Sequence, residues 1–341
     1  MNKTGGREIV KISDVAKMAG LSPATVSRVL NNHPYVSEDK KKRVAEAVKK
    51  LNYFPNSSAQ KLRGQKVDTI AVCMPLLTNP FFAYLLEGID QAATDAGLQL
   101  LVCQTRYEKK KELYYLNLLK SKQVDGIILA SIENQWEDIE EYTKHGPVIL
   151  CNEHCRAANV SQVYLDQVYG GYLGTRYLIE SGYNRIAYCR GEYASGLSLE
   201  RERGYRLAIE EYGLSSREEW VFRNSTDFQS GKQVARNIAN MKDKPNAVFT
   251  GSDQVAAGII VEAKRLGFRV PEDLGVIGFD DQPVAEVTVP SLTTIRQPVQ
   301  EIGKTAMELL IKEFNDELEQ PKLVTLPLQL IERASAKQPT N

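Results

Sequence analysis

A short N-terminal segment gathers one arginine and several small side chains of the kinds that contact nucleic acid. Arg28 can donate two parallel hydrogen bonds to guanine O6 and N7, and serine or threonine hydroxyl groups suit phosphate or mixed contacts. Proline and alanine offer only apolar contact, for example to a thymine methyl group. The candidate DNA-contacting residues of this segment are Ser22, Pro23, Ala24, Thr25, Ser27, Arg28 and Asn31.

These side chains need a helix that exposes them on one face. Apolar residues recur at helical spacing over residues 12–19, Gly20 ends that run, and Ser22 caps a second run. Ser37 is expected to cap a third helix. Two short helices joined by a tight turn outline a helix-turn-helix, in which the second helix lies in the major groove. The same pattern also fits a small helical module with a solvated basic face.

The distribution of charge separates the chain into two parts. Lysine plus arginine and aspartate plus glutamate each number 43, yet residues 1–66 hold 14 basic and 5 acidic side chains. A compact basic head on an acidic body indicates that the head contacts a polyanion while the body does something else.

From Thr69 the pattern changes to short apolar runs that alternate with helical segments, which is the βαβ rhythm of parallel sheets. The runs are TIAVCMP, QLLVC, GIILA and PVILC, followed by RIAYCR, WVF, AVFT and GVIGFD. The sequence therefore predicts two doubly wound parallel sheets in succession. The linker before them, residues 55–66, has too little apolar surface to fold alone.

Polar side chains follow several of these predicted strands, where ligands of open α/β sheets bind. The loops after the strands hold Thr78, Asn79, Ser252 and Asp280. Arg201 offers several hydrogen-bond donors and Asp280 offers an acceptor, while the aromatic ring of Phe81 or Phe228 offers a flat surface for stacking. This combination suits a small polyol, a sugar phosphate or a nucleobase. Each residue also fits a structural role as a helix cap, a salt bridge or a crossover residue.

The stretch ISDVAKMAGLSPATVSRVLNNHPYVSE resembles the DNA-binding head of the lactose-repressor (LacI/GalR) family, and similarity continues through NPFF, VDGIIL, SDQVAAG, VPEDLGVIGFDD and PSLTTIRQP. The resemblance implies an α/β chain with an all-α helix-turn-helix head and a periplasmic-binding-protein-like body of two doubly wound parallel-sheet lobes. The expected parts are a disordered tail (1–10), the head (11–54), a hinge (55–66) and an effector-binding and dimerisation body (67–336). Lobe 1 is expected at about 67–165 and 297–322, and lobe 2 at about 166–296 and 323–336.

The resemblance also implies roles for particular residues. Pro23 and Ala24 would begin the recognition helix and Arg28 would be its strongest base reader. In the hinge, Leu62 would wedge between base pairs of the minor groove, and Asn56 and Ala59 fit the same pattern. In the body, effector-contacting positions are occupied by Asp166, Arg201, Ser252, Asp280 and Gln297, with Phe228 near the usual aromatic stacker.

These observations favour a sequence-specific DNA-binding transcriptional regulator, expected to be a repressor that reads a pseudo-palindromic operator as a homodimer under control of an effector in the interlobe cleft. The stretches NNHPYVSE and GPVILC resemble the catabolite-control branch, in which the partner is a phosphorylated carrier protein instead of a small molecule. A solute-binding protein shares the body fold but predicts a secretory signal and no basic head. The polar end IERASAKQPTN is too short for a leucine heptad, which favours a dimer over a tetramer.

Other functional classes find little support. No run approaches the roughly 18 apolar residues of a membrane span, so a cytoplasmic location without membrane contact is expected. The five cysteines are odd in number and predict reduced core thiols. Cys151, His154 and Cys155 lack a second pair at zinc-finger spacing, so no metal or other cofactor is expected. The lysine- and tyrosine-rich segment 107–122 is interpreted as a solvated helix face. Without a serine elbow, Walker loop or G-x-G-x-x-G motif, the chain is not expected to be an enzyme.

Overall fold

The computed structural model describes residues 10–30, 33–53, 67–191 and 196–337 of the 341-residue chain. The chain divides into two units, Met1–Val67 and Asp68–Asn341. Four of the expected DNA-contacting residues lie outside the described residues: Asn31, Asn56, Ala59 and Leu62. Among the described residues, no helix is long and apolar enough to cross a membrane.

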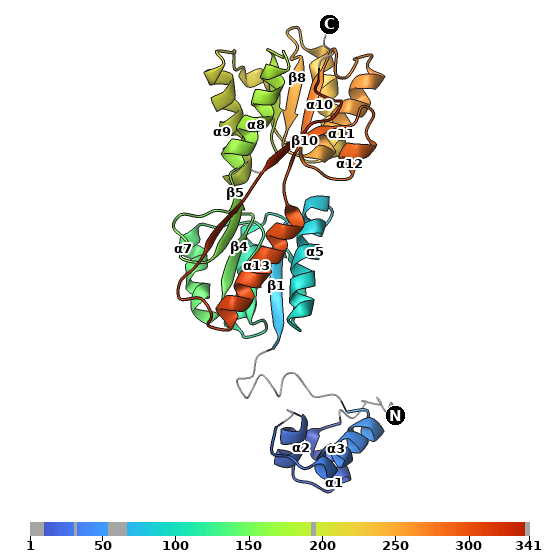
Figure 1. Cartoon of the computed structure of the whole chain (residues 1–341), viewed down its shortest axis with the longest axis vertical. Coiled ribbons are helices and arrows are strands. Elements are labelled where there is room, and N and C mark those ends of the chain that lie inside the picture. Colours follow the sequence, from blue (N-terminus) through green and yellow to red (C-terminus); the bar gives the residue numbers. More distant parts are fainter. Residues whose placement is uncertain (1–9, 31–32, 54–66, 192–195, 338–341) are drawn as a thin grey trace, which may run out of the picture. The chain divides into compact units, whose positions relative to one another are not determined.

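The first unit is a three-helix head made of α1 (Ile12–Ala19), α2 (Pro23–Leu30) and α3 (Glu38–Leu51) (Figure 1). Its small core contains Val15, Val26 and Val44, each at most 1% exposed. Gly20 has φ 62°, and a Cβ atom there would lie 2.7 Å from Nη2 of Arg43. Arg43 in turn donates to the carbonyl of Ala19 over 2.6 Å and 3.0 Å. The turn between α1 and α2 therefore requires glycine and is tied to α3.

The second unit begins with a sheet in the strand order β11-β5-β4-β3-β1-β2. Its strands, all parallel to their neighbours, are β1 (Thr69–Met74), β2 (Gln99–Gln104), β3 (Gly126–Leu129), β4 (Val148–Cys151), β5 (Gln162–Leu165) and β11 (Leu323–Leu326). Helices α5 (Pro80–Asp95) and α13 (Val299–Phe314) cover one face, and α6 (Lys109–Lys120) and α7 (Trp136–Ile139) cover the other. Alternate residues of β1 enter the two cores, which explains its continuous apolar sequence.

A second sheet has the order β12-β10-β9-β8-β6-β7. It contains β6 (Ile186–Cys189), β7 (Val221–Phe222), β8 (Ala247–Thr250), β9 (Gly275–Asp280), β10 (Thr293–Arg296) and β12 (Gln329–Ile331). Helices α8 (Gln167–Glu180) and α9 (Gly196–Glu211) pack on one face, and α10 (Phe228–Asn240) and α11 (Asp253–Arg265) pack on the other, with α12 (Val284–Val287) beside α11. The expected fold class is confirmed, although β12 runs antiparallel to β10.

The chain passes between the two lobes after β5, after β10 and between β11 and β12 (Figure 1). The first two passages lie at the expected limits near 165 and 297. The third does not, because Leu323–Leu326 pairs with β5 in lobe 1, so the assignment of 323–326 to lobe 2 is wrong. Exposed and half-buried residues alternate along β11, so its own sequence does not show which sheet it joins. Only its pairing with β5 places it in lobe 1.

The five cysteines are free thiols. Four of them, Cys73, Cys103, Cys151 and Cys189, are buried in the two lobes, whereas Cys155 is half-buried. The expectation that the cysteines lie in the core therefore holds for the four that lie in strands.

Candidate functional site

The outer face of α2 presents the candidate base-reading side chains. Val26 is fully buried and Val29 and Leu30 are half-buried, so the helix packs through the face that the periodicity predicts. Pro23, Ala24 and Arg28 are exposed on the opposite face, while Ser27 is half-buried. Within the described residues, no carboxylate forms an ion pair with Arg28. Its side chain is exposed on the face of α2 that lies away from the head core.

The two hydroxyl groups at the start of α2 bind each other and the helix. The backbone N–H of Thr25 donates to Oγ of Ser22 over 3.2 Å, and the two hydroxyl oxygens lie 2.9 Å apart. Ser22 therefore caps α2 as expected. Ser37 precedes α3, but its side chain forms no capping hydrogen bond, so its expected side-chain cap is wrong. The first turn of α3 instead carries Glu38 and Asp39, whose negative charges interact favourably with the positive end of the helix dipole.

In the body, Arg201 is held by a close approach of two helices. A Cβ atom on Gly171 of α8 would lie 2.1 Å from the carbonyl oxygen of Arg201 on α9, so this contact requires glycine. Nε of Arg201 donates to Oε1 of Gln167 over 2.7 Å, and Nη1 donates to the carbonyl of Gly251 over 3.0 Å. The guanidinium carbon lies 3.8 Å from the centre of the Phe279 ring. Burial lowers the pKa of Arg201, and the charge of Asp280 partly offsets this.

Asp280 lies at the end of β9 and is 7% exposed. Its carboxylate accepts from the side-chain amides of Gln297 over 2.5 Å and Gln282 over 2.9 Å. Burial raises the pKa of Asp280 to about 6, against the opposing effects of Arg201 and the two glutamines. The amide of Gln167 donates to Gln297 over 3.5 Å, which completes a chain of polar contacts from Arg201 to Asp280.

A cavity of about 460 Å³ opens beside Asp280. Its walls come from α5, the loop after β9 and the passage into α13, and they are formed by Phe81, Tyr84, Asp280, Asp281, Gln282, Pro283, Gln297, Pro298, Val299, Gln300 and Glu301. A neighbouring cavity of about 560 Å³ shares Tyr84 and Gln300 and includes Thr78. The fold therefore brings Phe81, Asp280 and Gln297 to one cavity, with residues from both lobes around it.

Three expected effector residues have local structural roles. Asn79, Asp166 and Ser252 are the N-caps of α5, α8 and α11, and their side chains accept backbone hydrogen bonds over 3.1, 2.8 and 3.1 Å. Phe228 is half-buried at the start of α10, with Nζ of Lys232 5.9 Å from its ring centre. None of these four lines either of the two cavities described above.

Gln297 was an expected effector residue, but two other glutamines of the network, Gln167 and Gln282, were not expected from the sequence. Gln167 links Arg201 to Gln297, and Gln282 links Asp280 to Gln254 over 3.0 Å. The buried Asp253 accepts from the backbone N–H of Gln282 over 2.6 Å, which fixes the loop after β9. Their only sequence signal is position, because each follows a strand end within the stretches LDQ, SDQ and DDQ.

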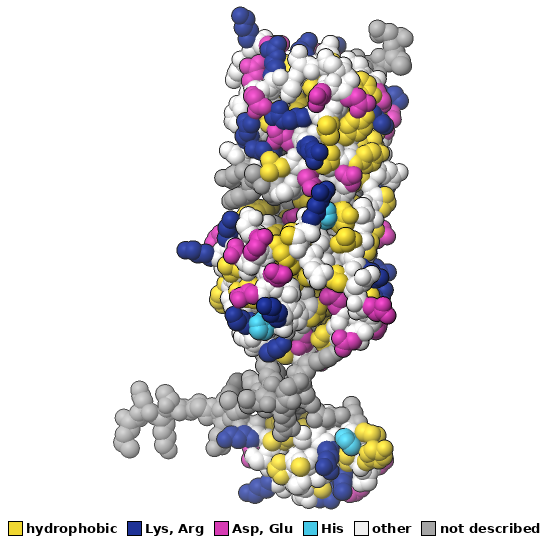
Figure 2. Space-filling view, turned by 90° about the vertical axis from the view of Figure 1, so that its left-hand side faces the viewer, with side chains coloured by type: hydrophobic (Ala, Val, Ile, Leu, Met, Phe, Trp, Pro, Cys, Tyr) yellow, Lys and Arg dark blue, Asp and Glu magenta, His cyan; other side chains and the backbone are white. Residues whose placement is uncertain are grey.

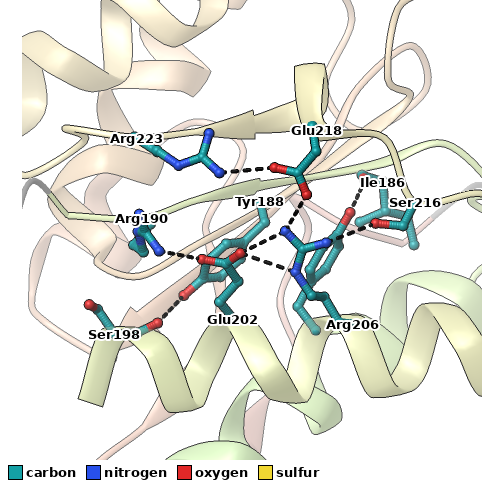
Figure 3. Close-up of polar contacts among 10 residues, drawn as sticks. Ile186, Tyr188, Arg190, Ser198, Glu202, Arg206, Ser216, Glu218 and Arg223 are labelled. Carbon is teal, nitrogen blue, oxygen red and sulfur yellow. Dashed lines mark hydrogen bonds and ion pairs between the residues drawn. The ribbon is translucent and has the colours of Figure 1, made fainter. Parts of the chain in front are cut away.

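An ion-pair cluster holds α9 against the edge of the second sheet (Figure 3). Glu202, next to Arg201 in the sequence, accepts from Arg190 at the end of β6 and from Arg206 one turn later, each over 2.8 Å. Glu218 accepts from Arg206 over 2.6 Å and from Arg223 over 2.9 Å, and so connects these two arginines. Glu202 is 7% exposed, so its pair with the half-buried Arg190 is shielded from solvent, whereas Glu218 and Arg223 are exposed; the shielded pair positions the helix that carries Arg201.

A helix-turn-helix head followed by a two-lobed body with a polar network where the lobes join is the architecture of ligand-responsive DNA-binding regulators. Residues 11–56 match the family described as bacterial regulatory proteins, lacI family, and residues 175–336 match a periplasmic binding protein-like domain. The chain belongs to the lacI family, and it is a DNA-binding transcriptional regulator.

Individual relatives are similar over nearly the whole chain. The NTD biosynthesis operon regulator NtdR of Bacillus subtilis is 42% identical, with 95% of this chain and 99% of the relative covered. Catabolite control protein A of Priestia megaterium is 34% identical, with 96% and 99% covered. A solved structure of the lac repressor dimer bound to operator and the anti-inducer ONPF superposes with a TM-score of 0.85 at 25% identity, covering 97% of this chain and all of that one. These proteins are transcription regulators, and none of the three descriptions names an enzyme.

Proposed function

We propose that this chain is a transcriptional repressor that binds a pseudo-palindromic operator as a homodimer and responds to a small-molecule effector bound between its lobes. The observation that carries the proposal is the polar chain from Arg201 through Gln167 and Gln297 to Asp280, which spans the passage from β10 to α13. A ligand that contacts these polar side chains also touches the connection between β10 and α13, and a rearrangement of the lobes must move that connection.

The head supports sequence-specific binding. Arg28 points away from the head core and can contact a guanine, while the exposed Pro23 and Ala24 offer apolar contacts to base edges. One recognition helix contacts only a few base pairs, so two heads are needed for a specific site. The lac repressor structure, a dimer on its operator, supports the same assembly for this chain.

The body offers surfaces that suit a second copy. β2 forms the end of the first sheet and exposes Leu101 (41%) and Val102 (38%) at that edge. On lobe 2, Val287 and Val289 are 75% and 71% exposed beside α12. Apolar side chains and an unpaired strand edge on a folded domain favour burial against a partner. We therefore assign dimerisation to the body.

The effector acts, in this proposal, by its different affinity for two arrangements of the lobes. Asp280 and Arg201 belong to lobe 2, Phe81 belongs to lobe 1, and Gln297 lies in the passage between the lobes. A ligand that replaces one of the Gln297 or Gln282 amide contacts favours the arrangement in which its own hydrogen bonds are complete. Such differential binding is sufficient to change operator affinity.

A phosphorylated carrier protein is the second candidate for the controlling partner. The similarity to catabolite control protein A favours it. The two candidates predict different results: a small-molecule effector raises the melting temperature of the purified chain, whereas a carrier protein is retained by the immobilised chain only when the carrier is phosphorylated.

The test of the proposal is selection of DNA sequences from a random pool by the full-length chain. We expect a two-fold symmetric motif and one dimer per motif by analytical ultracentrifugation. A motif without symmetry, or binding by a monomer, would contradict the proposed mode. A screen of sugars, sugar phosphates and nucleobases for changes in affinity toward the selected motif then tests the effector.

A further inference from the structure

Two cysteines of lobe 1 lie directly opposite each other on neighbouring strands. Cys73 of β1 and Cys103 of β2 are partners in the register of this parallel pair. Residues paired in this way point to the same face of a sheet, and both side chains enter the core on the side covered by α6 and α7. The fold therefore places two thiols side by side although they are far apart in the sequence.

The spacing of the strands permits a bond between the two sulfur atoms. Neighbouring strands lie about 4.8 Å apart, and cysteines joined by a disulfide have Cα atoms about 4.4–6.8 Å apart. A disulfide brings the two Cβ atoms to about 3.8 Å, which is closer than the strand spacing. Formation of the bond would therefore draw β2 toward β1.

The two thiols also differ in acidity because they interact with each other. A hydrogen bond from the Cys73 thiol lowers the pKa of Cys103, against the opposing effect of burial, and the same hydrogen bond together with burial raises the pKa of Cys73. When it carries its own proton, the Cys103 thiol donates to the carbonyl of Leu101 over 3.7 Å. Because the thiolate is the form of cysteine that reacts with an oxidant, Cys103 is the sulfur that reacts first.

Cys103 lies on the outermost strand of its sheet. β2 forms the end of the strand order, and the adjacent Leu101 and Val102 are 41% and 38% exposed, whereas Cys103 is 3% exposed. The half-buried Tyr115 packs against the same core, and its hydroxyl donates to the carbonyl of Gln104 over 3.4 Å. An edge strand opens locally at a lower free energy than a central strand, so a small oxidant can reach Cys103 without global unfolding.

The other three cysteines lack this arrangement. In the described strands, the register partners of Cys151 and Cys189 are valine, phenylalanine and threonine. Burial raises the pKa of both thiols well above the ordinary value, which disfavours the reactive thiolate. Cys155 is half-buried and follows β4 outside the strands. These three thiols therefore serve as internal controls for the pair.

We propose that Cys73 and Cys103 are a modification site at which hydrogen peroxide forms a reversible disulfide between β1 and β2. The Cys103 thiolate attacks one oxygen of the peroxide, the O–O bond breaks, and the leaving hydroxide takes up the proton that Cys103 lost. The sulfur of Cys73 then attacks the resulting sulfenic acid, and the thiol proton leaves with the hydroxyl group as water. Two thiols and one peroxide thus give one disulfide and two waters, and a dithiol reverses the bond by exchange.

The bond would act on a surface that is assigned to the dimer. Leu101 and Val102 precede Cys103 and are exposed at the edge of the sheet that we assign to dimerisation. Movement of Cys103 toward β1 shifts these side chains relative to a second copy. Oxidation is therefore expected to weaken the dimer and, with it, operator binding. This consequence rests on the proposed function, whereas the bond itself does not.

Peptide mapping of the full-length chain tests the bond. The reduced chain is treated with an excess of hydrogen peroxide at neutral pH, and the remaining thiols are then blocked with N-ethylmaleimide in denaturant. Trypsin releases residues 67–106 as one peptide that contains both cysteines, because no lysine or arginine lies between Lys66 and Arg106. We expect this peptide to be unlabelled and about 2 Da lighter than its reduced form, and to recover both thiols with dithiothreitol. Cleavage after Glu87 should give two fragments that the disulfide joins.

The same map shows when the inference fails. It is overturned if residues 67–106 carry two maleimide labels after oxidation. It is also overturned if Cys103 becomes a sulfinic or sulfonic acid without being joined to Cys73, or if either cysteine is joined to Cys155 instead.

Single substitutions show whether the folded arrangement directs the reaction. Cys73→Ser and Cys103→Ser should each prevent the bond, whereas Cys155→Ser, the matched control that removes the more accessible thiol, should leave it unchanged. The chain unfolded in guanidinium should oxidise without preference for this pair. Loss of the bond in Cys155→Ser, or equal preference in the unfolded chain, contradicts the assignment. If a serine variant melts at a lower temperature, the map of the original chain still decides.

Operator binding and sedimentation separate this inference from the proposed function. Both are measured before and after oxidation, with Cys73→Ser treated in the same way. We expect oxidation to lower operator affinity by about threefold or more in the original chain and to leave the variant unchanged. If the bond forms without any effect on the dimer or on operator affinity, the disulfide stands and its effect on the dimer is wrong. If the reduced chain does not bind a symmetric motif as a dimer, the proposed function is wrong and the map alone decides the bond.

Discussion

The buried carboxyl of Glu153 should make the stability of the body depend on pH in a way that a single substitution removes. The pKa of Glu153 is about 8 in the folded chain, against an ordinary value of 4.5. Between pH 4.5 and 8 the carboxyl of Glu153 has lost its proton in the unfolded chain and retains it in the folded chain. The contribution of the neutral carboxyl to stability is therefore complete below about pH 4.5 and is lost as the pH rises toward 8.

The size of the effect follows from the same two values. Linkage gives an upper limit of about 5 kcal/mol for the loss between pH 4.5 and 8. Burial also raises the pKa of Glu133 and of Glu200, whose charges act on Glu153, so the three carboxyls titrate together, and local relaxation reduces the cost further. We expect Glu153→Gln to gain about 2 kcal/mol of stability relative to the original chain over this range, because glutamine has the same shape and no charge.

Tryptophan fluorescence during urea unfolding is a direct assay. The chain has two tryptophans, and the structure buries Trp136 in lobe 1 and Trp220 in lobe 2, so the signal reports on both lobes and not on the head. The free energy of unfolding of each variant is measured from about pH 5 to 8.5. Effects of Asp280 and other groups largely cancel in the difference between variants. A difference that changes by less than about 0.5 kcal/mol over this range would refute the reasoning.

Three further substitutions test the proposed DNA and effector contacts. Arg28→Ala should cost about 1–3 kcal/mol of specific binding per half-site and leave thermal stability unchanged, and an unchanged ratio of operator to shuffled-DNA affinity would exclude a base contact. Leu62→Ala, outside the described residues, should weaken operator binding more than non-specific binding and reduce the DNA bend measured by energy transfer. Arg201→Ala should preserve operator affinity without effector and abolish the response to it, whereas a purely structural role predicts a lower melting temperature and weak DNA binding throughout.

The parts of the fold that could be predicted are those in which local sequence and final environment agree. Strands such as Ile186–Cys189 are buried on both faces and therefore read as continuous apolar runs. The turn at Gly20 and the inward face of α2 follow from helical periodicity. By contrast, β5 begins with Gln162, a buried polar residue whose amide binds the backbone of Cys155, so its sequence lacks the apolar run of a core strand.

The candidate site could be predicted only in part for a different reason. Asp280 stands out because a charged residue at the end of a buried strand needs a partner, and Arg201 and Gln297 were expected from the family resemblance. Gln167, which connects Arg201 to Gln297, is chemically ordinary, and it meets Gln297 only because of the way in which the chain passes between the lobes. Asn79, Asp166 and Ser252 show the converse: a polar residue after a strand is also the natural N-cap of the following helix, and the structure uses each in that way.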